Sequence, residues 1–134
     1  MNLKELTLKA IHDVNRFRSP DVTEWVRQVD PVLRALGEAE VGSDRVVALY
    51  TDTSDIHTGI PMVHITTEYE VRGGGSTNDA DIPMYIIESA DPVAAATEYK
   101  RVADIQALEY DIEVTEKALG IKKERLNKLL LRHR

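Results

Sequence analysis

The 134-residue chain contains no cysteine, so it can form neither a disulfide nor a thiolate metal site. It also lacks any run of about eighteen apolar residues, and we therefore expect no membrane-spanning helix and no membrane partner. Residues 1–17 are polar and periodic, unlike a signal peptide. Together these absences favour a cytoplasmic protein.

Several sequence motifs of enzymes are missing as well. The chain has no GxGxxG, no P-loop and no GxSxG. His64-Ile65-Thr66 is similar to the His-x-Thr element of two-histidine phosphoesterases, which need a second such element so that one histidine acts as base and the other as acid. Because no second element is present, we reject that resemblance and predict no catalytic residue and no cofactor.

His57 and His64 are the remaining candidates for a metal site, with Asp52, Asp55 or Glu68 as possible additional ligands. Residues two apart on a strand lie roughly 6.6 Å apart. His64 and Glu68 are four apart, which is too far to bind one ion, and zinc usually needs three or four protein ligands. We predict no metal site, and a metal-dependent hydrolase is only the third functional alternative.

The composition is that of a globular domain, with 43% hydrophobic and 30% charged residues. The organising stretch is residues 62–89. Side chains alternate from Met62 to Arg72, which predicts a half-buried strand. We expect three consecutive glycines to end it, the polar loop Gly73–Asp81 to be mobile and open to another protein, and residues 82–87 (IPMYII) to form the returning strand.

The elements before this hairpin are two helices and a strand. Asn2 is placed to cap a first helix. Ser19-Pro20 predicts the start of a second helix, with a kink or restart at Asp30-Pro31 and an end at Gly37. Residues 45–51 (RVVALYT) predict a strand buried on both faces. Short links between consecutive strands indicate a meander.

Asp91-Pro92 predicts the start of a long C-terminal helix that runs to Leu119. Gly120 either ends this helix or weakens it, and residues 122–132 are helical again. We therefore expect an α+β fold, a three-stranded antiparallel β-meander packed by two N-terminal helices and a long C-terminal helix. The predicted domains are a core of residues 1–119 and a basic helical extension of residues 120–134.

Apolar residues recur along the long helix at alternating spacings of three and four, as in a coiled coil. The positions of this seam are Ile105, Leu108, Ile112, Thr115, Leu119, Lys122, Leu126, Leu129 and His133. Its six Ile and Leu residues predict an interface. The leading hypothesis is a non-enzymatic interaction protein, a regulatory or structural-assembly subunit that forms a homo-oligomer through this helix.

The charges favour a second hypothesis, DNA binding. Lys117–Arg134 carries seven basic residues and one acid, whereas the other 116 residues carry 10 basic and 22 acidic side chains. Residues 117–130 (KALGIKKERLNKLL) resemble the turn and second helix of a helix-turn-helix unit, with the turn at Gly120. Glu116 stands where such units prefer a small residue. The predicted nucleic-acid contacts are Lys122, Lys123, Arg125, Lys128 and Arg132.

Overall fold

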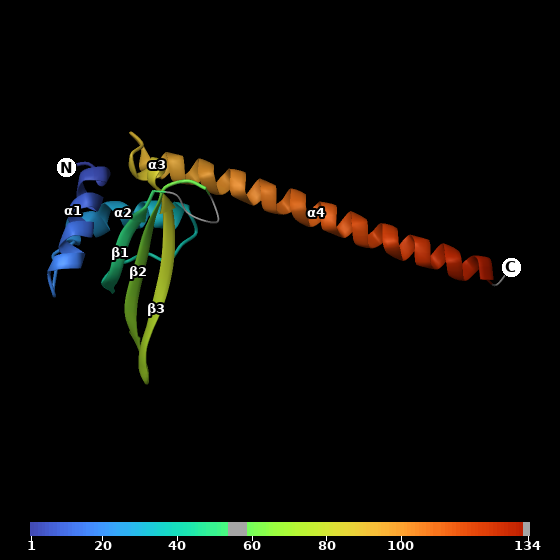
Figure 1. Cartoon of the computed structure of the whole chain (residues 1–134), viewed down its shortest axis with the longest axis horizontal. Helices are drawn as coiled ribbons and strands as arrows, with labels where there is room; N and C mark the ends of the chain where they lie inside the picture. The colour runs from blue at the N-terminus through green and yellow to red at the C-terminus, as the bar shows by residue number, and fades with distance from the viewer. Residues whose placement is uncertain (54–58, 133–134) are drawn as a thin grey trace. The chain divides into compact units, whose positions relative to one another are not determined.

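The structure, a computed structural model, describes residues 1–53 and 59–132. Its elements are α1 (Leu3–Arg16), α2 (Thr23–Ala35), β1 (Arg45–Asp52), β2 (Met62–Val71), β3 (Gly74–Pro83), α3 (Met84–Ile87) and α4 (Pro92–Arg132). The strands form one antiparallel sheet in the order β1-β2-β3 (Figure 1). The predicted α+β meander with two N-terminal helices and a long C-terminal helix is confirmed.

The chain divides into two compact units, Met1–Lys100 and Arg101–Arg134. Helix α4 begins in the first unit and accounts for the described part of the second. The domain boundary predicted between residues 119 and 120 lies inside this continuous helix, and the division into domains there stays a prediction.

Two helix starts are formed by the residues that the sequence predicted. The side chain of Asn2 accepts a hydrogen bond from the backbone N–H of Glu5 at 2.9 Å at the start of α1. Asp91 accepts one from the N–H of Ala94 at 3.1 Å at the start of α4, where Pro92 is the first helical residue. Each cap satisfies a backbone donor that has no partner within its helix.

The core of the first unit lies between the helices and one face of the sheet. Residues of β2 alternate, so Val63, Ile65 and Thr67 point inward and are buried. Trp25 and Val29 from α2 belong to the same core. At its centre the Nε1 of Trp25 donates a hydrogen bond of 3.1 Å to the hydroxyl of Thr7, which itself donates to the carbonyl of Leu3.

Helix α2 differs from the prediction at its start and at its proline. It begins at Thr23, not at Ser19-Pro20, because the carboxylate of Asp21 accepts hydrogen bonds from both the N–H and the hydroxyl of Thr23. It also continues through Pro31 without a restart. Asp30, the residue before this proline, holds the loop that follows α2 against the helix. Its carboxylate accepts hydrogen bonds from the N–H groups of Val41 and Gly42.

The outer face of the sheet is polar. The strand registers place Tyr50 of β1, His64 of β2 and Asp81 of β3 in one row across it. The prediction that β1 is buried on both faces is wrong, because Tyr50 is 49% exposed. An apolar run of this length does not distinguish a strand buried on both faces from one with an exposed aromatic side chain.

The segment predicted as the mobile loop Gly73–Asp81 is mostly strand β3. The turn is only Arg72-Gly73, since Val71 already pairs with Gly74. Gly73 has φ of +95°, a conformation that favours glycine. The prediction of a loop failed because ladder hydrogen bonds need no apolar side chains, and cross-strand pairs such as Thr66–Asp79, at 2.8 Å, support polar positions.

The returning strand predicted at residues 82–87 is also wrong. Strand β3 ends at Pro83, and Met84–Ile87 forms the one-turn helix α3. Pro83 has no N–H for a ladder, while the N–H of Met84 bonds to the carbonyl of Pro61 at 2.9 Å. Ile86 and Ile87 are buried in this turn, so burial alone accounts for the apolar run. Within the described part of the chain, no helix is long and apolar enough to span a membrane.

The hydroxyl of Thr7 provides a test of the core. The variant T7V keeps the branched shape but removes the acceptor for Trp25 Nε1, so a buried donor loses its partner. We expect T7V to lower the free energy of unfolding by about 1–3 kcal/mol in urea titrations. The control T7S keeps the hydroxyl and should lose less, and equal losses in the two variants would contradict this role of the hydrogen bond.

Candidate functional site

The first candidate site is the surface of α4 in the second unit. The six predicted interface residues all lie on this helix, and their exposed fractions range from 41% to 62%. They are Ile105, Leu108, Ile112, Leu119, Leu126 and Leu129. The structure therefore places all six on one helix with apolar surface left in contact with solvent, and their role in an interface stays a prediction. His133, the last position of the predicted seam, lies outside the described residues.

Further apolar residues of α4 lie away from the seam and were not predicted as part of the site. Tyr110, Val114, Ile121 and Leu131 are each more than 45% exposed. They occupy other positions of the heptad, so the apolar surface is wider than one stripe. A search for the regular spacing of three and four residues selects the seam and passes over these positions.

Helix α4 is continuous through Gly120. The turn predicted there by the resemblance to a helix-turn-helix unit is therefore wrong, because residues 117–130 belong to one helix. A single glycine costs about 1 kcal/mol relative to alanine, which is too little to end a helix whose flanking residues favour it. DNA binding by the exposed basic residues Lys122, Lys123, Arg125, Lys128 and Arg132 stays a prediction.

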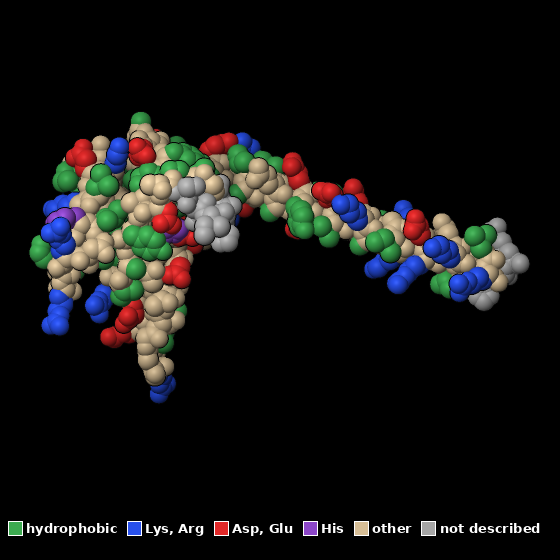
Figure 2. Space-filling model, in the orientation of Figure 1, with side chains coloured by type: hydrophobic (Ala, Val, Ile, Leu, Met, Phe, Trp, Pro, Cys, Tyr) green, Lys and Arg blue, Asp and Glu red, His purple; other side chains and the backbone are tan. Residues whose placement is uncertain are grey.

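Charge is divided along the second unit. Between residues 101 and 116 there are five acids and one basic residue, whereas residues 117–132 hold six basic residues and one acid. Figure 2 shows the acidic side chains on the earlier part of the helix and the Lys and Arg side chains gathered towards its C-terminal end. The two parts are joined by an ion pair from Lys117 Nζ to Glu113 Oε1 at 3.2 Å.

The second candidate site is centred on His64, on the outer face of the sheet. Its Nδ1 lies 2.6 Å from Oδ1 of Asp81, and its Nε2 lies 2.6 Å from Oδ2 of Asp52. The ring also lies beside that of Tyr50, with the centroids 4.8 Å apart. One histidine thus joins all three strands, since Asp52 ends β1, His64 lies in β2 and Asp81 lies in β3.

The surroundings of His64 favour its charged form. Burial of the ring, whose side chain is 14% exposed, would by itself lower the pKa. The hydrogen bonds to Asp81 and Asp52 and the charges of these carboxylates outweigh burial, so the pKa of His64 is raised above its ordinary value of 6.5. Only the imidazolium can donate from both ring nitrogens at once.

This arrangement suits a cross-strand ion pair better than catalysis or metal binding. A histidine whose two nitrogens both donate to carboxylates has no lone pair with which to accept a proton or bind an ion. Among residues 1–53 and 59–132, no group of three or more His, Asp or Glu side chains is arranged to hold a metal ion. His57 and Asp55, the other predicted candidates, lie outside the described residues.

Sequence reasoning identified His64 and Asp52 but missed Asp81. It assigned Asp81 to a loop, and only the pairing of β3 with β2 brings its carboxylate opposite His64. Glu68, proposed as a companion of His64, instead lies beside Gly75. A signal was present, since Asp79 and Asp81 alternate with Ala80 and Ile82 as in a strand with one buried face.

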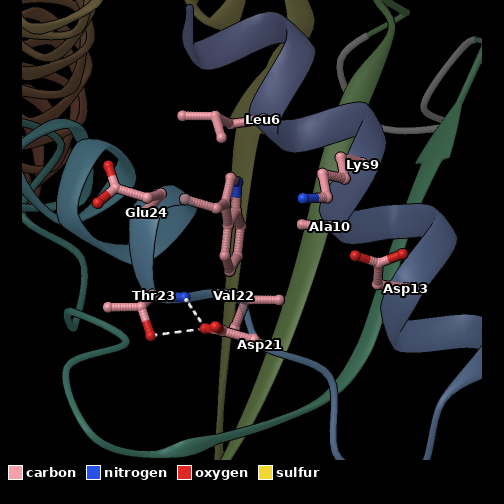
Figure 3. Close-up of a pocket in the computed structure, with 9 residues that line it drawn as sticks. Leu6, Lys9, Ala10, Asp13, Asp21, Val22, Thr23 and Glu24 are labelled. Atoms are coloured by element: carbon pink, nitrogen blue, oxygen red, sulfur yellow. Dashed lines mark hydrogen bonds between the residues drawn. The ribbon is translucent and has the colours of Figure 1, made fainter. Parts of the chain in front are cut away.

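A hollow of about 350 Å³ between α1 and the start of α2 was also considered (Figure 3). Lys9 and Asp13 from α1 face Asp21 and Glu24 across it. The carboxylate of Asp21 is already bonded to Thr23, which lowers its pKa. The charged groups surround an open groove whose floor is apolar, and nothing in it resembles a catalytic arrangement.

Comparisons of the chain with models of protein families, with curated proteins and with solved structures found no match.

The raised pKa of His64 predicts how stability depends on pH. A group that binds its proton more tightly in the folded state contributes fully below its unfolded pKa, near 6.5, and this contribution is lost as the pH rises through the folded pKa. We therefore expect H64N to destabilise the protein more at pH 6 than at pH 9, as measured by urea unfolding. In the background D52N/D81N this difference should shrink. A loss of stability that is constant or grows with pH would contradict the ion pair.

Proposed function

We propose that this protein is a non-enzymatic interaction protein that self-associates through α4, as a regulatory or structural-assembly subunit. The observation that carries the proposal is the exposure of the six Ile and Leu residues of the seam. Contiguous apolar surface of this kind marks interaction sites in proteins. A second copy of the chain presents the same repeat, and a two-helix coiled coil needs only such repeats facing one another.

The free energy available supports association. Each Leu or Ile gains about 1.5–3 kcal/mol when it is fully buried. The six seam residues are about half exposed, so their further burial in two copies gives a favourable term of roughly 10 kcal/mol, from which the entropy cost of association must be subtracted. Association would also stabilise α4 itself, because long helices in proteins owe most of their stability to packing of an apolar face.

Nucleic acid is the competing partner for the basic end of α4. Its five exposed basic residues were predicted on the basis of a helix-turn-helix unit, and the continuous helix takes away the geometric argument for that fold. What remains is charge alone. A gel shift whose strength falls steeply with salt would favour nucleic acid, because each phosphate neutralised releases counterions.

The self-association proposal predicts the effect of a double substitution in the seam. We expect the unaltered protein to have a mass above one chain by light scattering at tens of micromolar. L126D/L129D should convert it to a single chain, because four charges would have to be buried in each pair of copies. Circular dichroism should show that the sheet of the first unit stays folded.

A matched control comes from apolar residues away from the seam. I121D/L131D introduces the same charges on the same part of α4, at positions that are 60% and 66% exposed. This variant should keep the oligomeric mass. The proposal fails if the unaltered protein has the mass of one chain, or if the two double variants dissociate equally.

A further inference from the structure

We propose that two copies of α4 pair antiparallel, in a register centred on Lys117. The inference rests on the proposed self-association and goes beyond it by fixing the orientation and alignment of the two helices. The occupant of the exposed seam is a second copy of this chain, and the argument is charge complementarity. The acidic part, residues 101–116, of one copy lies along the basic part, residues 117–132, of the other, and antiparallel pairing achieves this for both copies at once.

The seam itself fits this register. With Lys117 opposite its own copy, each core position on one helix meets a core position on the other. The layers are Ile105 with Leu129, Leu108 with Leu126, Ile112 with Lys122, and Thr115 with Leu119. Each layer occurs twice by symmetry. The two polar positions, Thr115 and Lys122, thus face an apolar residue and never each other.

The positions that flank the seam are complementary in the same register. Asp111 faces Arg125 of the second copy, and Glu109 faces Lys123. Two further pairs, Asp104 with Arg132 and Val102 with Leu130, extend the match towards the ends of the overlap. Ala118 meets its own copy at the centre, where a small side chain lets the helices approach. Glu116 also meets its own copy, and this is the like-charged exception.

The surface of α4 offers a place for Lys122. A shallow hollow of about 230 Å³ is lined by Leu108, Asp111, Ile112, Thr115 and Glu116. Four of these have the spacing of the hole that receives a side chain in knobs-into-holes packing. In the proposed register Lys122 of the second copy enters this hollow. Its aliphatic stem would cover Ile112 while its ammonium group reaches Asp111 or Glu116, whose charge is thereby balanced.

A parallel pair in register would be unfavourable at several of these positions. Lys122 would face Lys122 of the second copy within the seam, and two ammonium groups would share one layer. At the flanking positions Asp104 would lie against Glu109 and Asp111 against Glu116. The like charges in each of these contacts repel each other. The same residues that support the antiparallel pair therefore disfavour the parallel one.

Spin labels measure the orientation directly, and the lack of native cysteine makes each introduced cysteine the single labelling site. We choose A103C and K117C in the full chain. Both positions are exposed, and both are the heptad position that faces away from the seam. In the proposed dimer the labels of A103C are about 42 Å apart along the helix axis. Those of K117C lie directly across the pair, at roughly 20 Å. A parallel pair would give the same short distance for both.

Charge exchange tests the register. D111R places like charges opposite one another in the proposed dimer, and so does R125E. We expect each to raise the dimer dissociation constant roughly tenfold at low salt, measured by sedimentation. The double variant D111R/R125E again faces opposite charges across the pair and should restore the original constant. In a parallel pair D111R would instead strengthen association, because Arg would meet Glu116.

The outcomes separate this inference from the function on which it rests. A single-chain mass for the unaltered protein overturns the proposed self-association. A dimer with equal short distances at both labels keeps self-association and overturns the antiparallel arrangement. A dimer with one long and one short distance, but no restoration in D111R/R125E, overturns the register centred on Lys117. The long and short distances together with restoration support the proposal.

Discussion

The main constraint on this molecule is that the apolar face of each helix must be covered by another surface for the helix to be stable. In the first unit that requirement is met within the chain, since Trp25, Val29 and the inward residues of the sheet belong to one core. Beyond Lys100 the same kind of side chain stays exposed along α4. An exposed helix of this length is a costly arrangement in water, because little of its stability then comes from packing. The proposed pairing of two copies would cover the apolar side chains of the second unit, as the core within one chain covers those of the first.

The histidine on the outer face of the sheet has a different kind of task. Sheets of three strands depend on cross-strand contacts as well as on the ladder, and a half-buried histidine cation between the carboxylates of Asp52 and Asp81 joins β1, β2 and β3. Because both nitrogens of His64 are used in these contacts, its imidazolium has no free lone pair with which to accept a proton or bind a metal ion. The geometry assigns it to the sheet.

The sequence predicted the elements whose signals are local. Asn2 and Asp91 mark helix starts through a hydrogen bond to a residue three positions on, Pro92 does so through its fixed φ, and these starts were placed correctly. The alternation in β2 was equally clear. Most of strand β3 was missed because glycine and polar residues have low strand propensity, which outweighed the short alternation at its end, and its stability comes from pairing with a neighbour. For the same reason Asp81 was not recognised as a partner of His64. The exposed seam could be predicted from spacing, but a spacing pattern does not say whether a helix continues through a glycine such as Gly120.

The position of β3 at the edge of the sheet bears on how this protein avoids aggregation through its strands. It is an edge strand of the sheet, and edge strands offer unpaired backbone groups to any other chain. Here the edge is made of glycines, the carboxylates Asp79 and Asp81, and a final proline. Repulsion between acids and the missing N–H of Pro83 discourage two such edges from joining into a larger sheet. The proposed pairing through α4 would raise the local concentration of sheet edges, so this protection would matter more in the pair than in a single chain.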